Sequence, residues 1–478
     1  MATQNESLIV PSWINGKEEI SSSTYPITSP STNKVVWHSS LTTPTTILPV
    51  IESSQSAFLT WSLTKPTYRR DILLKAASIL EERTEEYAPY MGTEMGAEVG
   101  ISHFFAMPLA IQMLKDIAGR ITSICGSVPA CAAEGMSAMV WKEPYGVALG
   151  IVPWNAPFVF GVRSAATAIA TGNTCILKAS EVTPRSYWAI GKAFHDAGLP
   201  AGVLNIISCP ATDAAAVTKV LIEHPDVKHV DFTGSAKVGR LISKACGENL
   251  KPCVMELGGK NSAIVLQDAN IETAVAECIA GSFANSGQIC MSTDLIILHA
   301  SIATSFLETL KTALSNSSSA NVPTLVSVSS KERAQKLVKD ALSNDGQLFF
   351  GAQPESGPPG ASFVPSILGN VGKNAQFWKE ESFAPMAGYV IVESEEEAIA
   401  IANKSEYGLS AAIFTEDLRR AFAIAKKIHS GAVHINTMTV LDDPVLPFGG
   451  VKASGWGRFN SEEGMNQFLV TKTVTWKD

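Results

Sequence analysis

The stretch Phe232-Thr-Gly-Ser-Ala-Lys-Val-Gly239 joins a short β-rich run, His229–Phe232, to a helical pattern over 236–246. A strand that ends in a glycine turn and leads directly into a helix directs backbone N–H groups and the positive end of the helix toward one point, which suits a phosphate. The stretch does not have the spacing of the GxGxxG dinucleotide fingerprint. From these residues alone, a phosphate-binding turn and a plain tight connection between strand and helix both stay open.

The order of strand and then helix recurs on both sides of this turn. Short β-rich runs lie at Val147–Val152, Thr174–Leu177, Val203–Ile207, His229–Phe232, Ala263–Val265, Leu295–Leu298, Ala387–Val392, Ala411–Phe414 and Gly431–Ile435. Helical periodicity appears over 45–62, 67–91, 185–198, 212–223, 236–246, 271–285, 330–343, 395–404 and 415–429. This alternation favours an α/β fold with mainly parallel sheets, in two blocks that meet near residue 255.

Two segments depart from the alternation and are expected to be strands outside the two blocks. One spans 121–143, with strand-like pieces at Ile121–Ile124 and Met136–Trp141, and the other is Phe468–Trp476 near the C-terminus. An exposed strand of this kind often pairs with another chain. We therefore expect these strands to contribute to a contact between subunits.

Composition excludes several classes of protein. The chain has 478 residues, too many for one compact domain, and its 46% hydrophobic and 17% charged residues exclude intrinsic disorder. A net charge of −8 makes nucleic acid and anionic membrane surfaces poor partners. The eight cysteines are scattered and form no CxxC pair, so a zinc or iron–sulfur site has no support and reduced thiols are expected.

No targeting or membrane segment is expected from the sequence. The run MATQNESLIVPSWINGKEE has neither a basic start followed by a long apolar stretch nor an enrichment in Arg. The most apolar stretch, Gly146–Val162, is interrupted by Pro153, Asn155 and Pro157, so it is expected to form buried strands and loops. These features predict a cytoplasmic protein.

Polar residues at the ends of two predicted strands are candidates for ligand binding, because α/β sheets hold ligands at the carboxyl ends of their strands. Lys178 and Glu181 follow the run Thr174–Leu177 and could bind a ribose, in which case the carboxylate would favour a free 2′-hydroxyl over a 2′-phosphate. A solvated charged turn is the alternative. Asn155 follows another apolar strand, where its amide could donate to an oxyanion or simply fix a turn.

Two further residues are candidates for catalysis. Cys290 in Gly287-Gln-Ile-Cys290 is a candidate nucleophile, although a cysteine is more often packed in a core. Glu256 stands between Met255 and Leu257 and precedes two glycines. A carboxylate in such an apolar frame has a raised pKa and can act as a general base, whereas a capping or ion-paired Glu is the alternative.

The order of these and other motifs resembles that of the NAD(P)-dependent aldehyde dehydrogenase superfamily, from about Trp13 to Trp476. The motifs are PWN at 153–155, LKASE at 177–181, FTGSAKVG at 232–239, MELGGK at 255–260, GQIC at 287–290, EESFAP at 380–385, NKSEYGL at 403–409 and PFGGVKASGWGR at 447–458. With Arg163 and HINTMTV at 434–440, the series looks like the branch that acts on salicylaldehyde, vanillin and other aromatic aldehydes.

The resemblance implies roles for individual residues. Cys290 would be the nucleophile, Glu256 the general base, and Asn155 an oxyanion donor together with the backbone N–H of Cys290. The residues implied to hold NAD are Trp154, Lys178, Ser180, Glu181, Gly234, Ser235, Val238, Gly239, Leu257, Glu381 and Phe383. No metal is implied. The substrate would contact Arg163, Phe105, Phe158, Phe160 and Phe448, with an ion pair the alternative for Arg163 and core packing for each phenylalanine.

The resemblance also implies a fold and a reaction. The expected parts are a Rossmann-like NAD-binding domain of 1–120 and 144–254, an α/β catalytic domain of 255–445, and a bridging element of 121–143 and 446–478 that forms a homodimer or homotetramer. The expected reaction oxidises an aldehyde, aromatic in kind, to the carboxylic acid with NAD through a thiohemiacetal and a thioester.

Two alternatives and two departures from the family pattern accompany this expectation. A CoA-acylating relative is disfavoured because that branch usually lacks the base that Glu256 supplies. A non-catalytic dinucleotide-binding structural protein is disfavoured by the presence of Cys290, Glu256 and Asn155 together. The family commonly has Gly where Ala384 stands, and often Arg where Leu295 stands, but neither change removes a catalytic group.

Overall fold

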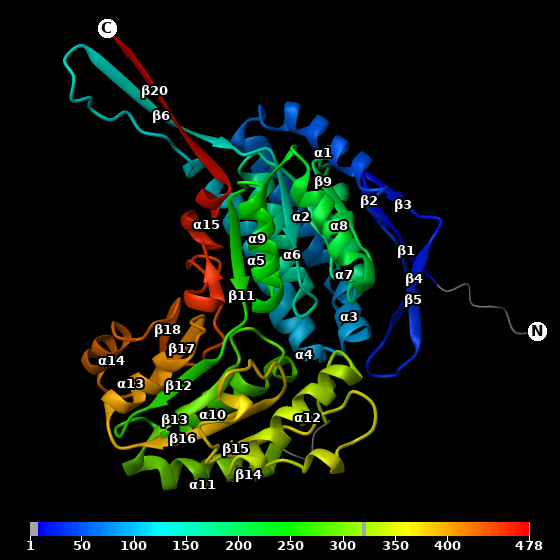
Figure 1. Cartoon of the computed structure of the whole chain (residues 1–478). Helices are drawn as coiled ribbons and strands as arrows, with labels where there is room; N and C mark the ends of the chain where they lie inside the picture. The colour runs from blue at the N-terminus through cyan, green and yellow to red at the C-terminus, as the bar shows by residue number, and fades with distance from the viewer. Residues whose placement is uncertain (1–7, 318–321, 478) are drawn as a thin grey trace, which may run out of the picture.

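The computed structural model describes residues 8–317 and 322–477, which build two large sheets placed one above the other (Figure 1). The first sheet has eight strands, in the spatial order β19 (Gly455–Trp456), β11 (Cys253–Leu257), β10 (Val227–Gly234), β7 (Val147–Ile151), β8 (Thr174–Lys178), β9 (Leu204–Ile207), β2 (Ser12–Ile14) and β3 (Lys17–Glu19). The five strands from β11 to β9 are parallel.

The second sheet has seven strands and lies below the first in Figure 1. Their order is β14 (Gln347–Phe350), β15 (Ser366–Gly369), β16 (Met386–Val392), β13 (Thr293–His299), β12 (Asn261–Val265), β17 (Ser410–Phe414) and β18 (Ala432–Ile435). All neighbours pair in parallel except β14 and β15. The chain crosses from the first sheet to the second through Gly258–Lys260, between β11 and β12.

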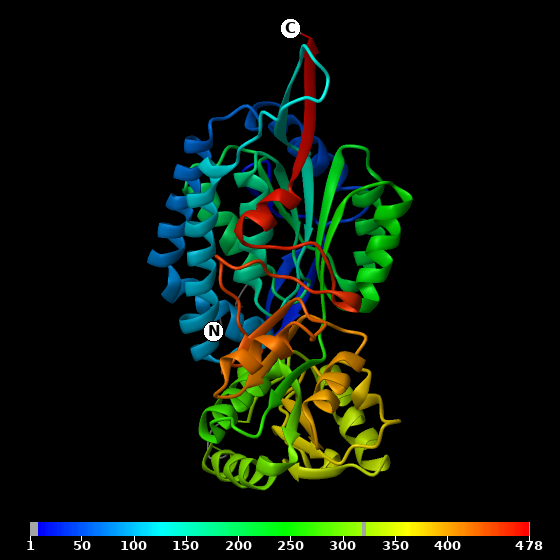
Figure 2. The same ribbon diagram turned by 90° about the vertical axis from the view of Figure 1, so that its left-hand side faces the viewer.

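Two smaller sheets complete the strands. One contains β1 (Ile9–Val10), β5 (Val35–Ser40) and β4 (Thr24–Thr28). The other pairs β6 (Met136–Pro144) with β20 (Leu469–Lys477) over nine residues, and it projects from the molecule as a two-stranded arm (Figures 1 and 2).

Helices cover both faces of both large sheets. They are α1 (Leu48–Trp61), α2 (Pro66–Glu82), α3 (Thr84–Met95), α4 (Val99–Ile101), α5 (Met107–Arg120), α6 (Pro157–Ala170), α7 (Pro184–Asp196), α8 (Ala211–Glu223), α9 (Ala236–Glu248), α10 (Ile271–Phe283), α11 (Ala300–Ser317), α12 (Val328–Ser343), α13 (Glu395–Lys404), α14 (Leu418–Ala425) and α15 (Ser461–Gln467). On the first sheet, α2, α5, α6 and α7 share one apolar core, and α1, α8 and α9 share the other. On the second, α10 and α11 pack on one face and α13 and α14 on the other.

Helix α6 lies especially close to the first sheet. A Cβ built on Gly150 of β7 would stand 2.0 Å from the Oγ of Ser164 on α6, so a larger residue at 150 would force the helix away. This close contact matters for the site because α6 follows directly on the loop that carries Asn155.

The fold confirms the predicted α/β class and each of the nine predicted β-rich runs. The predicted strand at Ile121–Ile124 is wrong, because Ile121–Ser123 forms a 3₁₀ turn that continues from α5. The helical pattern over 67–91 is divided at Arg83, where α2 ends and α3 begins. The expectation that Gly146–Val162 contains only strands and loops is also wrong, since α6 begins at Pro157, a residue suited to the first turn of a helix.

The expected division into domains stays a prediction, although two of its borders can be compared with the strands. The border at 254/255 runs through β11, which pairs with β10 throughout, so residues up to Leu257 belong to the first sheet. Within 446–478, β19 also joins the first sheet, while β20 pairs with β6 of the other bridging segment. Among the described residues, none of the helices combines the length and apolar character needed to cross a membrane.

Candidate active site

The carboxyl ends of three neighbouring strands of the first sheet bring the predicted catalytic and cofactor residues to one edge. Asn155 follows β7, Ser235 follows β10, and Glu256 lies in β11 directly opposite Thr233. Cys290 reaches the same region from the second sheet, three residues before β13 begins. The site therefore lies between the two large sheets, at the edge where parallel sheets generally bind ligands.

A cleft of about 570 Å³ occupies this edge. Its lining includes nine predicted residues: Trp154, Asn155, Phe160, Gly234, Ser235, Glu256, Cys290, Glu381 and Phe383. Thr233, Lys237, Arg333 and Tyr407 also line it, and none of these four was predicted as a site residue.

A second, apolar pocket of about 30 Å³ adjoins the cleft at Cys290. Three predicted substrate residues, Phe105, Phe160 and Phe448, line it, whereas Phe158 is fully buried in the core and lines neither cavity. Phe105 lies in a π-helical turn, Ser102–Ala106, a rare element that often marks functional sites. Since Cys290, Asn155 and Phe160 line both cavities, the thiol stands where the cleft and the pocket meet.

Burial and mutual contact control the protonation of Cys290 and Glu256. Cys290 is 8% exposed and Glu256 1% exposed. Burial raises the pKa of Glu256 to about 7, against the opposing attraction of Arg163 and the thiol of Cys290. Burial, and next the charge of Glu256, raises the pKa of the Cys290 thiol well above its usual value. The carboxylate is therefore placed to take the proton of the thiol.

The alternative interpretation, a helix cap or an ion pair, does not hold, because Glu256 lies within β11 and forms no ion pair among the described residues. Its Oε1 is buried and has no hydrogen-bond partner within residues 8–317 and 322–477. A buried carboxylate oxygen without a partner costs free energy of folding, and such a cost is commonly retained where the group performs chemistry.

The side chain of Asn155 donates through Nδ2 to the backbone oxygen of Gln288, at 2.9 Å. A primary amide has two N–H donors, so the second one is available to a ligand in the cavities that Asn155 lines. This contact also connects the loop after β7 to the loop that carries Cys290.

The cleft has the features that a nicotinamide dinucleotide needs. Ser235 caps α9, its Oγ accepting from Val238 N at 3.4 Å, and the first turn of the helix lines the cleft, an arrangement that suits a pyrophosphate. A Cβ on Gly258 would stand 2.4 Å from a carboxylate oxygen of Glu381, so only glycine leaves Glu381 in place. The rings of Trp154 and Phe383 meet edge to face, 5.6 Å apart. These residues fit the dinucleotide.

The other predicted cofactor residues lie outside the lining of this cleft. Lys178, Ser180 and Glu181 are at the carboxyl end of β8, beside β7, and Lys178 pairs in register with Ile151. Val238 is 42% exposed on α9. Gly239 and Leu257 pack on one another, because a Cβ on Gly239 would stand 2.4 Å from the Leu257 side chain. Leu257 therefore supports α9 rather than lining the cleft.

The segment that carries Glu381 and Phe383 is held by cations that the sequence did not reveal. Arg333 donates to the backbone oxygens of Glu381, at 2.9 Å, and Ser382, at 2.5 Å. Lys260 lies 3.5 Å from Asp294 and donates to Ser382 Oγ at 3.2 Å. Arg333 lies in a predicted helix with the polar face of an ordinary solvent-exposed helix. The sequence around it therefore gives no indication that it binds the segment of Glu381 and Ser382.

Arg163 forms a buried ion pair with Asp442, which was the alternative to a substrate contact. Its guanidinium also lies over the ring of Phe448, 4.6 Å from the centroid. Arg163 lines neither cavity, whereas Asp442 and Phe448 line the apolar pocket. Arg163 therefore contacts residues that line the pocket without lining the pocket itself.

The two departures from the family pattern, Ala384 and Leu295, are both buried. The carbonyl of Ala384 approaches Gly287, since a Cβ there would stand 2.1 Å from the Ala384 oxygen. Leu295 belongs to the apolar cluster under α13 and α14 and lines a separate hollow of about 730 Å³. Neither residue lines the cleft or the apolar pocket.

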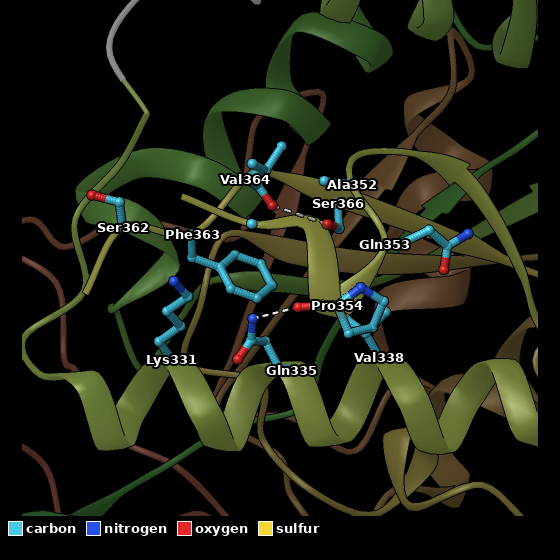
Figure 3. A pocket seen from close by; sticks show the side chains of 11 residues that line it. Lys331, Gln335, Val338, Ala352, Gln353, Pro354, Ser362, Phe363, Val364 and Ser366 are labelled. Carbon is cyan, nitrogen blue, oxygen red and sulfur yellow. Dashed lines mark hydrogen bonds between the residues drawn. The ribbon is translucent and has the colours of Figure 1, made fainter. Parts of the chain in front are cut away.

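One more hollow, between α12 and the loop over 352–366, has room for about one water molecule (Figure 3). Gln335 donates to the oxygen of Pro354 at 2.5 Å, and Ser366 Oγ to that of Val364 at 2.9 Å. These hydrogen bonds hold the loop against α12 and leave few polar groups free to bind a ligand.

Over the described part of the chain, no three His, Cys, Asp or Glu residues cluster to hold a metal ion.

Comparison with known proteins agrees with this geometry. The aldehyde dehydrogenase family model matches residues 14–474. The vanillin dehydrogenase of Pseudomonas sp. strain HR199 is 40% identical over 475 residues, which cover 98% of this chain and 97% of that protein. The salicylaldehyde dehydrogenase of Pseudomonas putida G7, solved with salicylaldehyde, has a TM-score of 0.95 at 32% identity, with 98% of each chain covered.

A further solved structure, the NAD⁺ complex of an aldehyde dehydrogenase from Bacillus cereus, has a TM-score of 0.93 at 28% identity, covering 99% of this chain and 97% of that one. The family match spans nearly the whole chain, and a cleft lined by several of the predicted residues lies between the two sheets. The chain therefore belongs to the aldehyde dehydrogenase family and is an oxidoreductase that oxidises aldehydes with a nicotinamide dinucleotide.

Proposed function

We propose that this chain oxidises an aromatic aldehyde to its carboxylic acid with NAD, through a covalent intermediate on Cys290. The observation that carries the proposal is the position of Cys290, which lines both the cleft and the apolar pocket and is in contact with Glu256. A nucleophile must reach the substrate on one side and present it to the cofactor on the other.

The first step joins the thiol sulfur to the aldehyde carbon. Glu256 takes the thiol proton as the C–S bond forms, and the oxygen of the resulting thiohemiacetal accepts from the Asn155 amide and the Cys290 backbone N–H. One such donor is typically worth about 3 kcal/mol in the transition state. When bound, the dinucleotide supplies the acceptor for the hydride that leaves the same carbon, which converts the thiohemiacetal into a thioester.

The second step hydrolyses the thioester. Glu256 first loses the thiol proton to solvent and then takes a proton from water as the water oxygen adds to the acyl carbon. The C–S bond breaks to release the acid, and the thiolate takes the proton back from Glu256 to restore the thiol. Aldehyde, NAD and water are consumed, and acid, NADH and a proton are formed. Dividing oxidation and hydrolysis through a covalent intermediate lowers each barrier.

The apolar pocket supports an aromatic substrate. Phe105, Phe160 and Phe448 offer flat apolar surfaces beside the sulfur, and no lysine or arginine lines this pocket. Relatives named for vanillin, salicylaldehyde and benzaldehyde support the same class. The pocket holds only about 30 Å³ as it stands, so the side chains around it have to move when a ring enters.

An assay of NADH formation over a panel of aldehydes tests this proposal. We expect kcat/KM for benzaldehyde and salicylaldehyde to exceed that for straight-chain aldehydes of similar size by about 10-fold or more, because ring surface is buried against the phenylalanines. A preference for aliphatic aldehydes would contradict the aromatic assignment. Dependence on CoA would favour the CoA-acylating alternative, and a lack of NADH with every aldehyde would favour a structural protein.

We also propose that NAD is preferred over NADP, because Glu181 follows β8 where an adenosine ribose would lie. A carboxylate there accepts from a free 2′-hydroxyl and repels a 2′-phosphate. We expect Glu181→Gln to lower the ratio of kcat/KM for NAD to that for NADP by about 10-fold, measured with one aldehyde. Glu223→Gln, on α8, is the control and should leave the ratio unchanged. An unchanged ratio in Glu181→Gln would contradict the assignment.

The projecting arm supports a homodimer, or a tetramer built from two dimers. Met139, Trp141 and Trp476 on β6 and β20 are 39–45% exposed, an unusual position for large apolar side chains. We expect light scattering after size exclusion to give a multiple of the chain mass, and Trp141→Asp to shift it toward the monomer. A stable wild-type monomer would exclude this role.

We further propose a cytoplasmic location, which the unpaired state of all eight cysteines supports.

A further inference from the structure

The loop that leads to Cys290 has an unusual backbone. Asn285, Ser286 and Gly287 have φ angles of 51°, 57° and 66°, three left-handed residues in succession. Left-handed residues are uncommon outside glycine, and asparagine tolerates this region better than most residues. A Cβ on Gly287 would collide with the backbone of Ala384, so the turn has little freedom to relax.

The turn places the side chain of Asn285 against the loop after β7. Asn285 Nδ2 donates to the backbone oxygen of Asn155 at 3.0 Å, although 130 residues separate the two in sequence. In return, Asn155 Nδ2 donates to the backbone oxygen of Gln288 at 2.9 Å. Two side chains thus join the same two loops, one in each direction.

The remaining contacts hold this arrangement in place. Gln288 N donates to the backbone oxygen of Asn285 at 3.0 Å, and Gln288 Oε1 accepts from Val326 N at 2.9 Å. Asn155, Asn285 and Gln288 are 4%, 5% and 1% exposed, so water does not compete for these bonds. The orientation of the Asn285 amide is fixed, because only its N–H groups can face the carbonyl of Asn155.

We propose that Asn285 is a positioning residue for the oxyanion site. It holds the backbone of Asn155 so that the second N–H of the Asn155 amide is aimed at the oxygen that develops charge when Cys290 attacks. This inference rests on the proposed role of Asn155. Asn285 also lines the apolar pocket, and its Oδ1 has no hydrogen-bond partner among the described residues, but its Nδ2 is bound to Asn155. We expect its removal to act through Asn155.

Asn285→Gly tests the proposal, since glycine accepts the left-handed backbone and lacks only the amide. We expect kcat/KM for an aromatic aldehyde to fall by about 10–100-fold, because small misplacements of catalytic groups have effects of this size. Alkylation of Cys290 by iodoacetamide, which displaces iodide from a saturated carbon and develops no oxyanion, should stay within about twofold of wild type. Ser286→Gly is the matched control, because its hydroxyl donates to Thr324 and not to Asn155.

A double-mutant cycle with Asn155→Ala separates positioning from general structural support. The double variant should be no less active than Asn155→Ala alone, within about threefold, because the two residues act as a unit. Multiplying effects, a parallel loss of alkylation, or wild-type activity in Asn285→Gly would each overturn the proposal. If Asn155→Ala is itself fully active, the oxyanion role of Asn155 fails instead. If Asn285→Gly does not fold, Asn285→Asp replaces it, because aspartate has the size of asparagine but lacks the N–H donor. Its activity is then measured alone and in combination with Asn155→Ala.

Discussion

Replacing Cys290 with alanine is expected to lower NADH formation by at least about 10⁴-fold, because no other described thiol lines either cavity and the reaction depends on a bond to sulfur. Binding of NAD should stay within a few-fold of wild type, since the dinucleotide contacts proposed above come from other residues. The quenching of tryptophan fluorescence is a suitable measurement, as Trp154 lines the cleft.

Cys278→Ala is the matched control for this variant. Cys278 is also buried, at 1% exposed, but it belongs to the core between α10 and the second sheet. It should lose some stability and keep its turnover. A Cys290→Ala protein that retains more than a few per cent of wild-type activity, with NAD binding intact, would show that the nucleophile lies elsewhere.

Glu256→Gln is expected to slow hydrolysis of the thioester by about 10²–10⁴-fold, the usual contribution of a general base. The amide fills the same space but cannot accept the proton of water. Acyl-enzyme should accumulate during turnover and appear in an intact-mass spectrum as a protein heavier by the acyl group. Its absence, together with slow turnover, would mean that loss of the base slows attack by the thiol more than it slows hydrolysis of the thioester.

Asp231→Asn is the control for a change in buried charge. Asp231 is also 1% exposed, and burial raises its pKa to about 7, but it lines neither cavity.

The wild-type enzyme should also show the base directly in its pH profile. Glu256 works when it is deprotonated and its pKa is about 7, so kcat should fall as pH drops through 7 and level off above it. Glu256→Gln should lose this dependence.

How much of the fold the sequence predicted depended on the periodicity of each segment. Nine strands of the two large sheets were recognised because short runs of β-branched and aliphatic residues stood between turn residues, whereas β2, β3, β11, β14, β15 and β19 were not predicted. Helix α6 was missed because all fourteen of its residues are buried, so it shows no polar face, and because prolines stand near its start. Strand β11 was not recognised as a strand, since Glu256 interrupts its apolar run.

For the site, the sequence predicted the residues that stand in motifs and missed those that act through distant contacts. Cys290, Glu256 and Asn155 could be named from short segments. The pairing of Arg163 with Asp442 spans 279 residues, and that of Asn285 with Asn155 spans 130. Such contacts depend on how two sheets are placed against each other, which no local pattern encodes. The same limit explains why Arg333 was overlooked.

Cys290 lines both the cleft and the apolar pocket, and this arrangement bears on the order in which acid and dinucleotide would leave. In the proposed reaction, an acyl group bonded to that sulfur would lie in the apolar pocket, whereas the residues that would hold the dinucleotide line the cleft. Water would then reach the thioester carbon from the cleft, which Glu256 also lines. The acyl group would thus be retained by its bond to sulfur while the dinucleotide is exchanged, because the two would occupy different cavities.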